Sequence, residues 1–170
     1  MSDKEILDAT CGGRSIWHPE NKDRDDTLYI DKRELDSLNR EEFGHSPRNY
    51  SIEPDEVQDY RDLPYDDDSF NLIVFDPPHA VRGDGMETLS GVSFRKWGCL
   101  HAETWQDDLE RGFSELFRVL APGGTLVFKF NNESADFEEV LSLAPQDPLF
   151  GTSVKDHTSE TRWFVFYKEE

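Results

Sequence analysis

The stretch NLIVFDPPHAV, residues 71–81, runs from an apolar segment directly into an acid, two prolines and a histidine. The continuous apolar content of residues 70–75 predicts a strand that is buried on both faces, as in a parallel sheet. Asp76 follows this strand at once, so its carboxyl group should lie at the strand's carboxyl end. Ligands of open α/β sheets bind at that end. The stretch therefore predicts a parallel sheet with a ligand site beside Asp76.

Strand and helix patterns alternate along the rest of the chain. Further strands are predicted at residues 5–9, 27–31, 125–130, 148–151 and 161–168, with a weaker one around Val57. Helices are predicted at residues 32–43, 104–120 and 134–144, whereas residues 16–26 should form one short turn and residues 46–56 a loop. This order predicts an α/β fold with a doubly wound, mostly parallel seven-stranded sheet and an antiparallel C-terminal hairpin. Residues 1–170 should form a single domain.

The connection at residues 80–103 is long for a compact domain and is expected to be a lid or substrate loop. It holds a small basic and aromatic cluster made of Arg82, Arg95, Lys96 and Trp97. Such a cluster suits a nucleic-acid strand, and ordinary packing of the lid is the alternative. Lys129, near the end of its strand, is expected to point toward the same cleft or to be a surface residue.

The net charge of -19 leaves two interpretations open. One is an acidic protein with small or protein partners, because a polyanion-binding surface is normally basic. The other, which we favour, is adaptation to molar salt, where charges are screened within about 3 Å. The composition resembles that of haloarchaeal proteins. Cysteine and histidine spacings predict no metal site, and apolar runs are far shorter than the roughly 20 residues of a membrane span, so a cytoplasmic protein is expected.

Four segments, in this order and spacing, resemble the motifs of class I S-adenosylmethionine-dependent methyltransferases. They are ILDATCGGR (6–14), YIDKRE (29–34), QDYRDLPYDDDSFNLIVFDPPH (58–79) and FRVLAPGGTLVFKF (117–130). The resemblance covers residues 6–167 and implies a Rossmann-like methyltransferase fold. The DPPH segment is similar to the amino-methylating DPPY-type branch, and the chain resembles its small stand-alone enzymes from phages and archaeal viruses.

The resemblance implies S-adenosylmethionine as the cofactor and assigns it a set of contacts. These are Asp8, Thr10, Cys11, Gly12, Gly13 and Arg14 in the first motif, Asp31 and Lys32 in the second, Asp59 and Tyr60 in the third, and Asp76. Arg14 would bind the cofactor's carboxylate unless it is a surface residue. Asp31 would accept the ribose hydroxyls unless it caps the next helix. Asp59 would contact adenine, with Asp62 as its competitor, and Cys11 is expected to pack rather than react.

The resemblance assigns catalysis to Asp76, Pro77, Pro78 and His79. Asp76 and the Pro77 carbonyl would accept the two hydrogens of an exocyclic amine and aim its lone pair at the methyl group. The prolines would hold that carbonyl in one direction. His79 stands where the branch has an aromatic ring, and it would stack on the substrate or accept a proton. A rigid turn with no catalytic role is the alternative for the whole segment.

These expectations together predict an N-methyltransferase that acts on an exocyclic amino group of a nucleic-acid base. Adenine in DNA is the first expectation and RNA the second. A protein amide or a small amine is an alternative acceptor, and a non-catalytic cofactor-binding subunit is a further alternative. The expected substrate-binding residues are His79, Arg82, Arg95, Lys96, Trp97 and Lys129. Sequence specificity would come from the lid, from a homodimer or from a partner protein.

Overall fold

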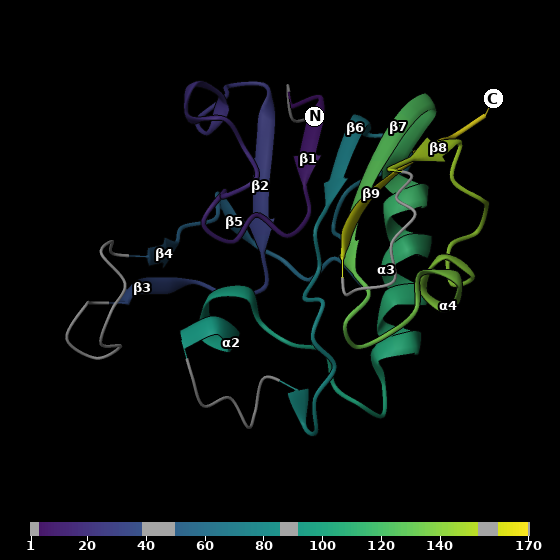
Figure 1. The fold of residues 1–170 in the computed structure, drawn as a ribbon. Helices are drawn as coiled ribbons and strands as arrows, with labels where there is room; N and C mark the ends of the chain where they lie inside the picture. Colours follow the sequence, from purple (N-terminus) through teal and green to yellow (C-terminus); the bar gives the residue numbers. More distant parts are fainter. Residues whose placement is uncertain (1–3, 39–49, 86–91, 153–159, 170) are drawn as a thin grey trace.

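The computed structural model describes residues 4–38, 50–85, 92–152 and 160–169, and its centre is a seven-stranded sheet (Figure 1). The strands are β1 (Ile6–Asp8), β2 (Thr27–Asp31), β5 (Glu56–Val57), β6 (Phe70–Phe75), β7 (Leu120–Asn131), β8 (Phe150–Gly151) and β9 (Thr161–Tyr167). Their order across the sheet is β5-β2-β1-β6-β7-β9-β8. The first five strands in this order are mutually parallel, and β9 is antiparallel to both β7 and β8. The predicted mostly parallel sheet with an antiparallel C-terminal pair is confirmed.

Helix α3 (Trp105–Val119) covers one face of the sheet with its apolar side. The ring of Phe113 lies 5.5 Å from that of Phe75 and 5.0 Å from that of Phe128, centroid to centroid. A Cβ atom at Gly112 would be 2.5 Å from the ring of Tyr60, so only glycine allows the helix to approach this closely. Helix α4 (Phe137–Leu141), shorter than predicted, packs on the same face. No helix among the described residues is long and apolar enough to cross a membrane.

The prediction of a helix at residues 32–43 is wrong for its described part. The chain instead forms β3 (Leu35–Leu38), which pairs antiparallel with β4 (Tyr50–Ile52) in a separate two-stranded sheet. Two leucines three positions apart fit a helix face, but here both are paired across strands. Residues 39–49 lie outside the described residues. Strand β4 also begins inside the segment predicted as a loop.

The connections at the carboxyl ends of the parallel strands are short or partly helical. Between β1 and β2 the chain makes only the 3-10 turn η1 (Pro19–Asn21), as the sequence predicted. The predicted lid at residues 80–103 contains helix α2 (Val92–Trp97), and residues 86–91 lie outside the described part. The ends of this segment are held together because Arg82 N–H donates to the Leu100 carbonyl (3.0 Å) and Leu100 N–H to that of Ala80 (2.8 Å). Helix α2 lies beyond the carboxyl ends of the parallel strands (Figure 1).

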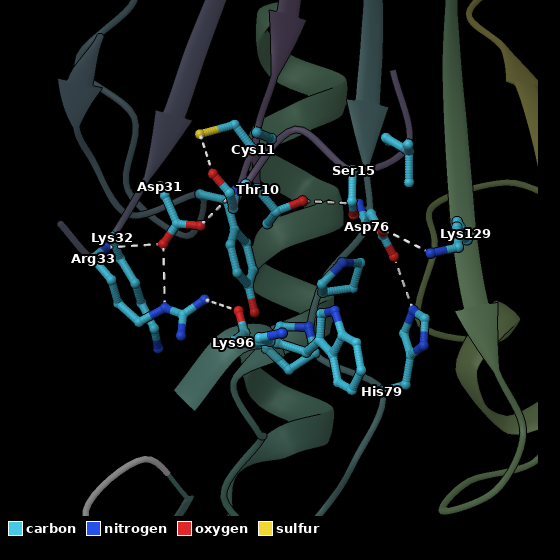
Figure 2. Close-up of a pocket in the computed structure, with 18 of the residues that line it drawn as sticks. Thr10, Cys11, Ser15, Asp31, Lys32, Arg33, Asp76, His79, Lys96 and Lys129 are labelled. Carbon is cyan, nitrogen blue, oxygen red and sulfur yellow. Dashed lines mark hydrogen bonds and ion pairs between the residues drawn. The ribbon is translucent and has the colours of Figure 1, made fainter. Parts of the chain in front are cut away.

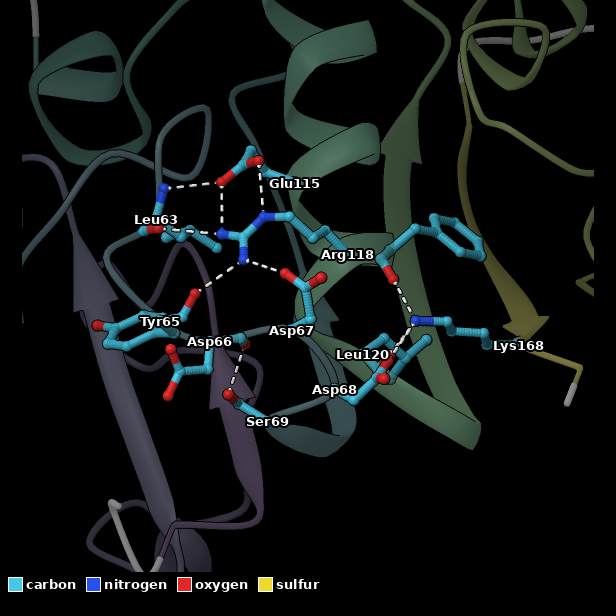
Figure 3. Close-up of polar contacts among 11 residues, drawn as sticks. Leu63, Tyr65, Asp66, Asp67, Asp68, Ser69, Glu115, Arg118, Leu120 and Lys168 are labelled. Carbon is cyan, nitrogen blue, oxygen red and sulfur yellow. Dashed lines mark hydrogen bonds and ion pairs between the residues drawn. The ribbon is translucent and has the colours of Figure 1, made fainter.

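The opposite end of the sheet carries a set of ion pairs that we call the basal network (Figure 3). Its members are Leu63, Tyr65, Asp67, Asp68, Glu115, Arg118 and Lys168. Arg118 donates to the carbonyls of Leu63 (3.0 Å) and Tyr65 (2.8 Å), and it also pairs with the carboxylates of Glu115 and Asp67. The network ties the loop before β6 to the end of α3.

Candidate functional site

A cavity of about 290 Å³ opens where the parallel strands β1, β2 and β6 end. Of the predicted site residues, it is lined by Thr10, Cys11, Gly12, Gly13, Asp31, Lys32, Tyr60, Asp76, Pro77, Pro78, His79, Lys96, Trp97 and Lys129 (Figure 2). Its volume is at the lower end of the range that small-molecule sites have. The structure therefore brings most of the predicted residues together around one hollow.

The turn after β1 presents its backbone to this cavity. Gly12 has φ +48° and Arg14 φ +52°, so the turn uses the left-handed region twice. The Gly12 N–H donates to Asp31 Oδ2 (3.1 Å), and the Gly13 N–H donates to the Tyr50 hydroxyl (3.0 Å). A Cβ atom at Gly13 would lie 2.6 Å from the Tyr50 ring, so no side chain fits there.

Asp31, at the end of β2, is held by three groups although it lines the cavity. Besides Gly12, its carboxylate accepts hydrogen bonds from the Arg33 backbone N–H (2.9 Å) and the Arg33 Nε (3.4 Å). Arg33 also donates to the carbonyls of Arg95 (3.0 Å) and Lys96 (3.3 Å) in α2. Because no helix follows β2 directly, the helix-capping alternative for Asp31 is wrong.

The structure places Asp8 and Arg14 outside the cavity, in contrast to the prediction. Asp8 is fully buried beneath the turn, where it accepts from Trp17 Nε1 (2.7 Å) and Thr10 N–H (3.2 Å). Burial raises the pKa of Asp8 from its ordinary value of 3.8 to about 7. Arg14 turns away from the ligand side, because its guanidinium donates to the Lys22 carbonyl (2.7 Å) and stacks 3.9 Å from the Tyr29 ring centroid.

Asp59 and Arg95 also lie outside the cavity. Asp59 is held by a two-point ion pair with Arg61 (2.9 and 2.6 Å), so its carboxylate is directed at that guanidinium. Arg95 contributes its carbonyl to Arg33 but lines no described cavity. Cys11 is buried, and burial raises the pKa of its thiol, which agrees with a packing residue rather than a nucleophile.

Asp76 is bonded through both its backbone and its side chain (Figure 2). Its backbone N–H donates to Thr10 Oγ1 (2.8 Å), Lys129 Nζ lies 2.8 Å from Oδ2, and His79 Nε2 lies 2.9 Å from Oδ1. Lys129 reaches it because β6 and β7 are parallel with Phe75 opposite Phe128, so the next residue on each strand is also adjacent. The His79 ring packs edge-on against Phe130, with centroids 5.2 Å apart.

A second cavity of about 400 Å³ adjoins the first and shares His79, Trp97 and Thr161 with it. Its other lining residues include Arg82, Phe94, Asn131, Glu133 and Ser134. The Arg82 guanidinium lies 5.3 Å from the Phe94 ring centroid, and Trp97 is 61% exposed. His79 therefore stands at the junction of the two cavities.

Several lining residues were not predicted from the sequence. They are Ala9, Ser15, Ile16, Arg33, Tyr50 and Thr161 in the first cavity, and Phe94, Glu133 and Ser134 in the second. Tyr50 is the most consequential, because its hydroxyl accepts from Gly13 N–H and donates to the Lys96 carbonyl (3.0 Å). The sequence predicted a loop at residues 46–56, and nothing in it indicates that this ring covers the glycine turn.

The sheet order, with a glycine turn after β1 and a cavity at the carboxyl ends, defines a Rossmann-like fold of the class I methyltransferase type. Among solved structures, the chain is similar to the PH0226 protein from Pyrococcus horikoshii OT3, with a TM-score of 0.56 and 14% identity over 97% of this chain and 81% of that one. It is also similar to a SAM-dependent methyltransferase from Methanosarcina mazei, with a TM-score of 0.52 and 14% identity over 99% and 94% of the two chains. No family model and no curated protein sequence matches the chain. At this identity the likeness establishes the fold.

Proposed function

We propose that this chain is an S-adenosylmethionine-dependent N-methyltransferase whose acceptor is the exocyclic amino group of a nucleic-acid base, with adenine in DNA as the first candidate. The observation that carries the proposal is the position of the Asp76–His79 segment, which lines the first cavity and reaches the second at His79. Methyl transfer needs a donor and an acceptor in neighbouring sites with a positioned group between them.

The first cavity is lined by groups that can bind S-adenosylmethionine. Gly12 and Gly13 bring backbone close to the ligand, Asp31 offers carboxylate oxygens for ribose hydroxyls, and the buried ring of Tyr60 forms an apolar wall. Bound there, the cofactor would supply a methyl group on a positively charged sulfur. Gly12, Gly13, Asp31 and Tyr60 are the residues proposed to hold it.

The acceptor amine would be positioned by Asp76 and the Pro77 carbonyl. Each oxygen of the Asp76 carboxylate already has one partner, Lys129 or His79, and keeps a second lone pair for an amine hydrogen. Pro77 is buried and Pro78 half-buried, so the direction of the carbonyl between them is fixed by two locked rings. These residues hold the acceptor in one orientation.

A flat base is favoured by the composition of the second cavity. Trp97 is exposed at its edge and Arg82 lies across the Phe94 ring, so an unstacked base would find an aromatic face and a cation. Lys96 and Lys129 add positive charge to the first cavity. The acidic remainder of the surface is compatible with nucleic acid at high salt, where repulsion is screened.

The test is transfer of labelled methyl groups from S-adenosylmethionine to unmethylated DNA, total RNA and a protein mixture, each at low and at molar salt. We expect label in DNA adenine, at least about 10³-fold less label with Asp76→Ala, and cofactor binding by calorimetry that Asp76→Ala retains. Asp67→Ala in the basal network is the matched control and should transfer normally. No label on any nucleic acid at either salt contradicts the proposed acceptor. Label on protein alone would favour an amide or amine acceptor. A complex with a partner protein whose activity survives Asp76→Ala would favour a non-catalytic subunit.

A further inference from the structure

We infer that His79 is the proton acceptor of the transfer step, with Lys129 as the positioning residue that leaves this task to the imidazole; the inference rests on the proposed function. Methylation of a neutral amine releases one proton, and the junction of the two cavities holds few groups to receive it. His79 lines both cavities and is bonded to Asp76.

Asp76 itself is a poor candidate for the proton because of Lys129. The Lys129 ammonium lies 2.8 Å from Oδ2, and both side chains are largely shielded from water. A carboxylate oxygen paired with an ammonium group at this distance already has one partner, so it serves as an acceptor of hydrogen bonds. The ion pair therefore keeps Asp76 as an orienting group.

The same carboxylate fixes the tautomer of His79. An ionised carboxylate only accepts, so the nitrogen 2.9 Å from Oδ1 carries the hydrogen and the neutral ring has its lone pair on Nδ1. Edge-on packing against Phe130 limits rotation of the ring. No side chain in the described part of the chain hydrogen-bonds to Nδ1. The arrangement of carboxylate, imidazole and reacting group is the one that makes a histidine a general base in hydrolases.

Atoms, electrons and charge balance in the proposed methyl transfer. The amine lone pair forms a nitrogen–carbon bond to the methyl group, the carbon–sulfur bond breaks with its electron pair going to sulfur, and the nitrogen's proton passes to His79 Nδ1. The imidazolium that results is stabilised by Asp76 at its other nitrogen. The Asp76–Lys129 pair is neutral overall, so it has no net negative charge to attract a cationic amine. The acceptor class that fits is a neutral, flat amine such as that of a nucleobase.

The charged groups around His79 come from four parts of the fold. Asp76 follows β6, Lys129 lies on β7, and Arg82 and Glu133 line the second cavity with the ring. Asp8, below Asp76, adds a more distant carboxyl group. Because a protonated imidazole cannot take another proton, the transfer rate should fall as pH falls.

The first experiment determines the tautomer of the His79 imidazole by ¹⁵N NMR of the histidines in the full chain. It does not depend on methyl-transfer activity. We expect the Nε2–H tautomer for His79. Lys129→Arg keeps a cation beside Asp76 and should keep this tautomer. An Nδ1–H tautomer in the wild type overturns the inference.

The second experiment is the pH dependence of kcat with methyl-accepting DNA. His79→Gln should lower kcat by about 10²-fold and abolish the decline at low pH, whereas His18→Gln, at an exposed position, should keep both. If wild type is active and His79→Gln keeps its pH profile, or if Glu133→Gln removes the decline instead, the inference fails and the proposed function stands. If wild type methylates no amine at any pH, both fail.

Discussion

The two ends of the central sheet use acidic residues in opposite ways. At the carboxyl end, Asp8 is buried beneath the site and, among the described residues, accepts hydrogen bonds from Thr10 and Trp17 rather than from a cation; burial raises its pKa to about 7. At the amino end, hydrogen bonds from Arg118 lower the pKa of Glu115 below its ordinary value. The basal network satisfies its charges internally, while the groups around Asp76 face two cavities. The same chemical groups thus serve stability at one end and remain available to a ligand at the other.

The largest expected difference between the two ends of the sheet lies in how the free energy of unfolding depends on pH. The folded pKa of Asp8, about 7, lies above its ordinary value of 3.8, so the folded state binds a proton that the unfolded state loses between these values. Stability from this group is present below about pH 4 and is lost as pH rises to 7, by roughly 4 kcal/mol. Urea unfolding at several pH values should show this slope in wild type and not in Asp8→Asn.

Asp66→Asn, at an exposed loop position, is the control for this measurement and should keep the wild-type slope. The amide at position 8 leaves one of the donors Trp17 and Thr10 without an acceptor, so Asp8→Asn should lower stability at low pH. The slope, not the absolute value, is therefore the quantity to compare. A wild-type slope that survives in Asp8→Asn would show that Asp8 does not carry it.

Two lysines provide the second contrast, since each pairs with an aspartate at one end. Lys129→Met should lower kcat for methyl transfer by about 10²-fold, because Asp76 loses the partner that orients it. Lys168→Met removes bonds to Asp68 and to the carbonyls of Phe117 and Leu120, so it should keep kcat and lower the free energy of unfolding by about 1–2 kcal/mol. Equal effects of both variants on kcat would remove the distinction between the ends.

A contrast within the basal network concerns Arg118 alone. Arg118→Ala leaves the carbonyls of Leu63 and Tyr65 and the carboxylate of Glu115 without this donor, which should cost about 2 kcal/mol in the free energy of unfolding. Arg24→Ala, whose pair with Asp26 is local and exposed, should give no measurable change. Denaturant midpoints of the two variants at pH 8 provide the comparison. If Arg118→Ala unfolds at the wild-type midpoint, the basal network is dispensable.

Much of the sheet and helix α3 were predictable because their apolar patterns agree with their burial. Residues 27–31 and 70–75 are apolar runs in buried strands, and residues 105–119 carry their apolar side chains at helical spacing. The helix predicted at residues 32–43 failed because the three-residue spacing of Leu35 and Leu38 is typical of a helix face. The chain instead pairs with β4, and the register of that pairing shifts between the two leucines.

The site was predictable where function depends on position along a strand, as for Asp31 and Asp76. The site was not predictable where a long side chain can reach several alternative hydrogen-bond partners. Arg14 has carbonyl and carboxylate partners from residues 22, 23, 53 and 55, which are scattered along the sequence. The Lys129–Asp76 pair depends on the register between β6 and β7, which a single sequence does not specify.

Tyr50 couples ligand binding in the first cavity to the position of α2. Its hydroxyl joins the Gly13 amide to the Lys96 carbonyl, so a ligand that takes the Gly13 amide for itself breaks the link between the glycine turn and α2. By thermodynamic reciprocity, a molecule that draws α2 toward the second cavity changes the affinity of the first by the same factor. The binding of the two ligands is then coupled through a single phenol hydroxyl.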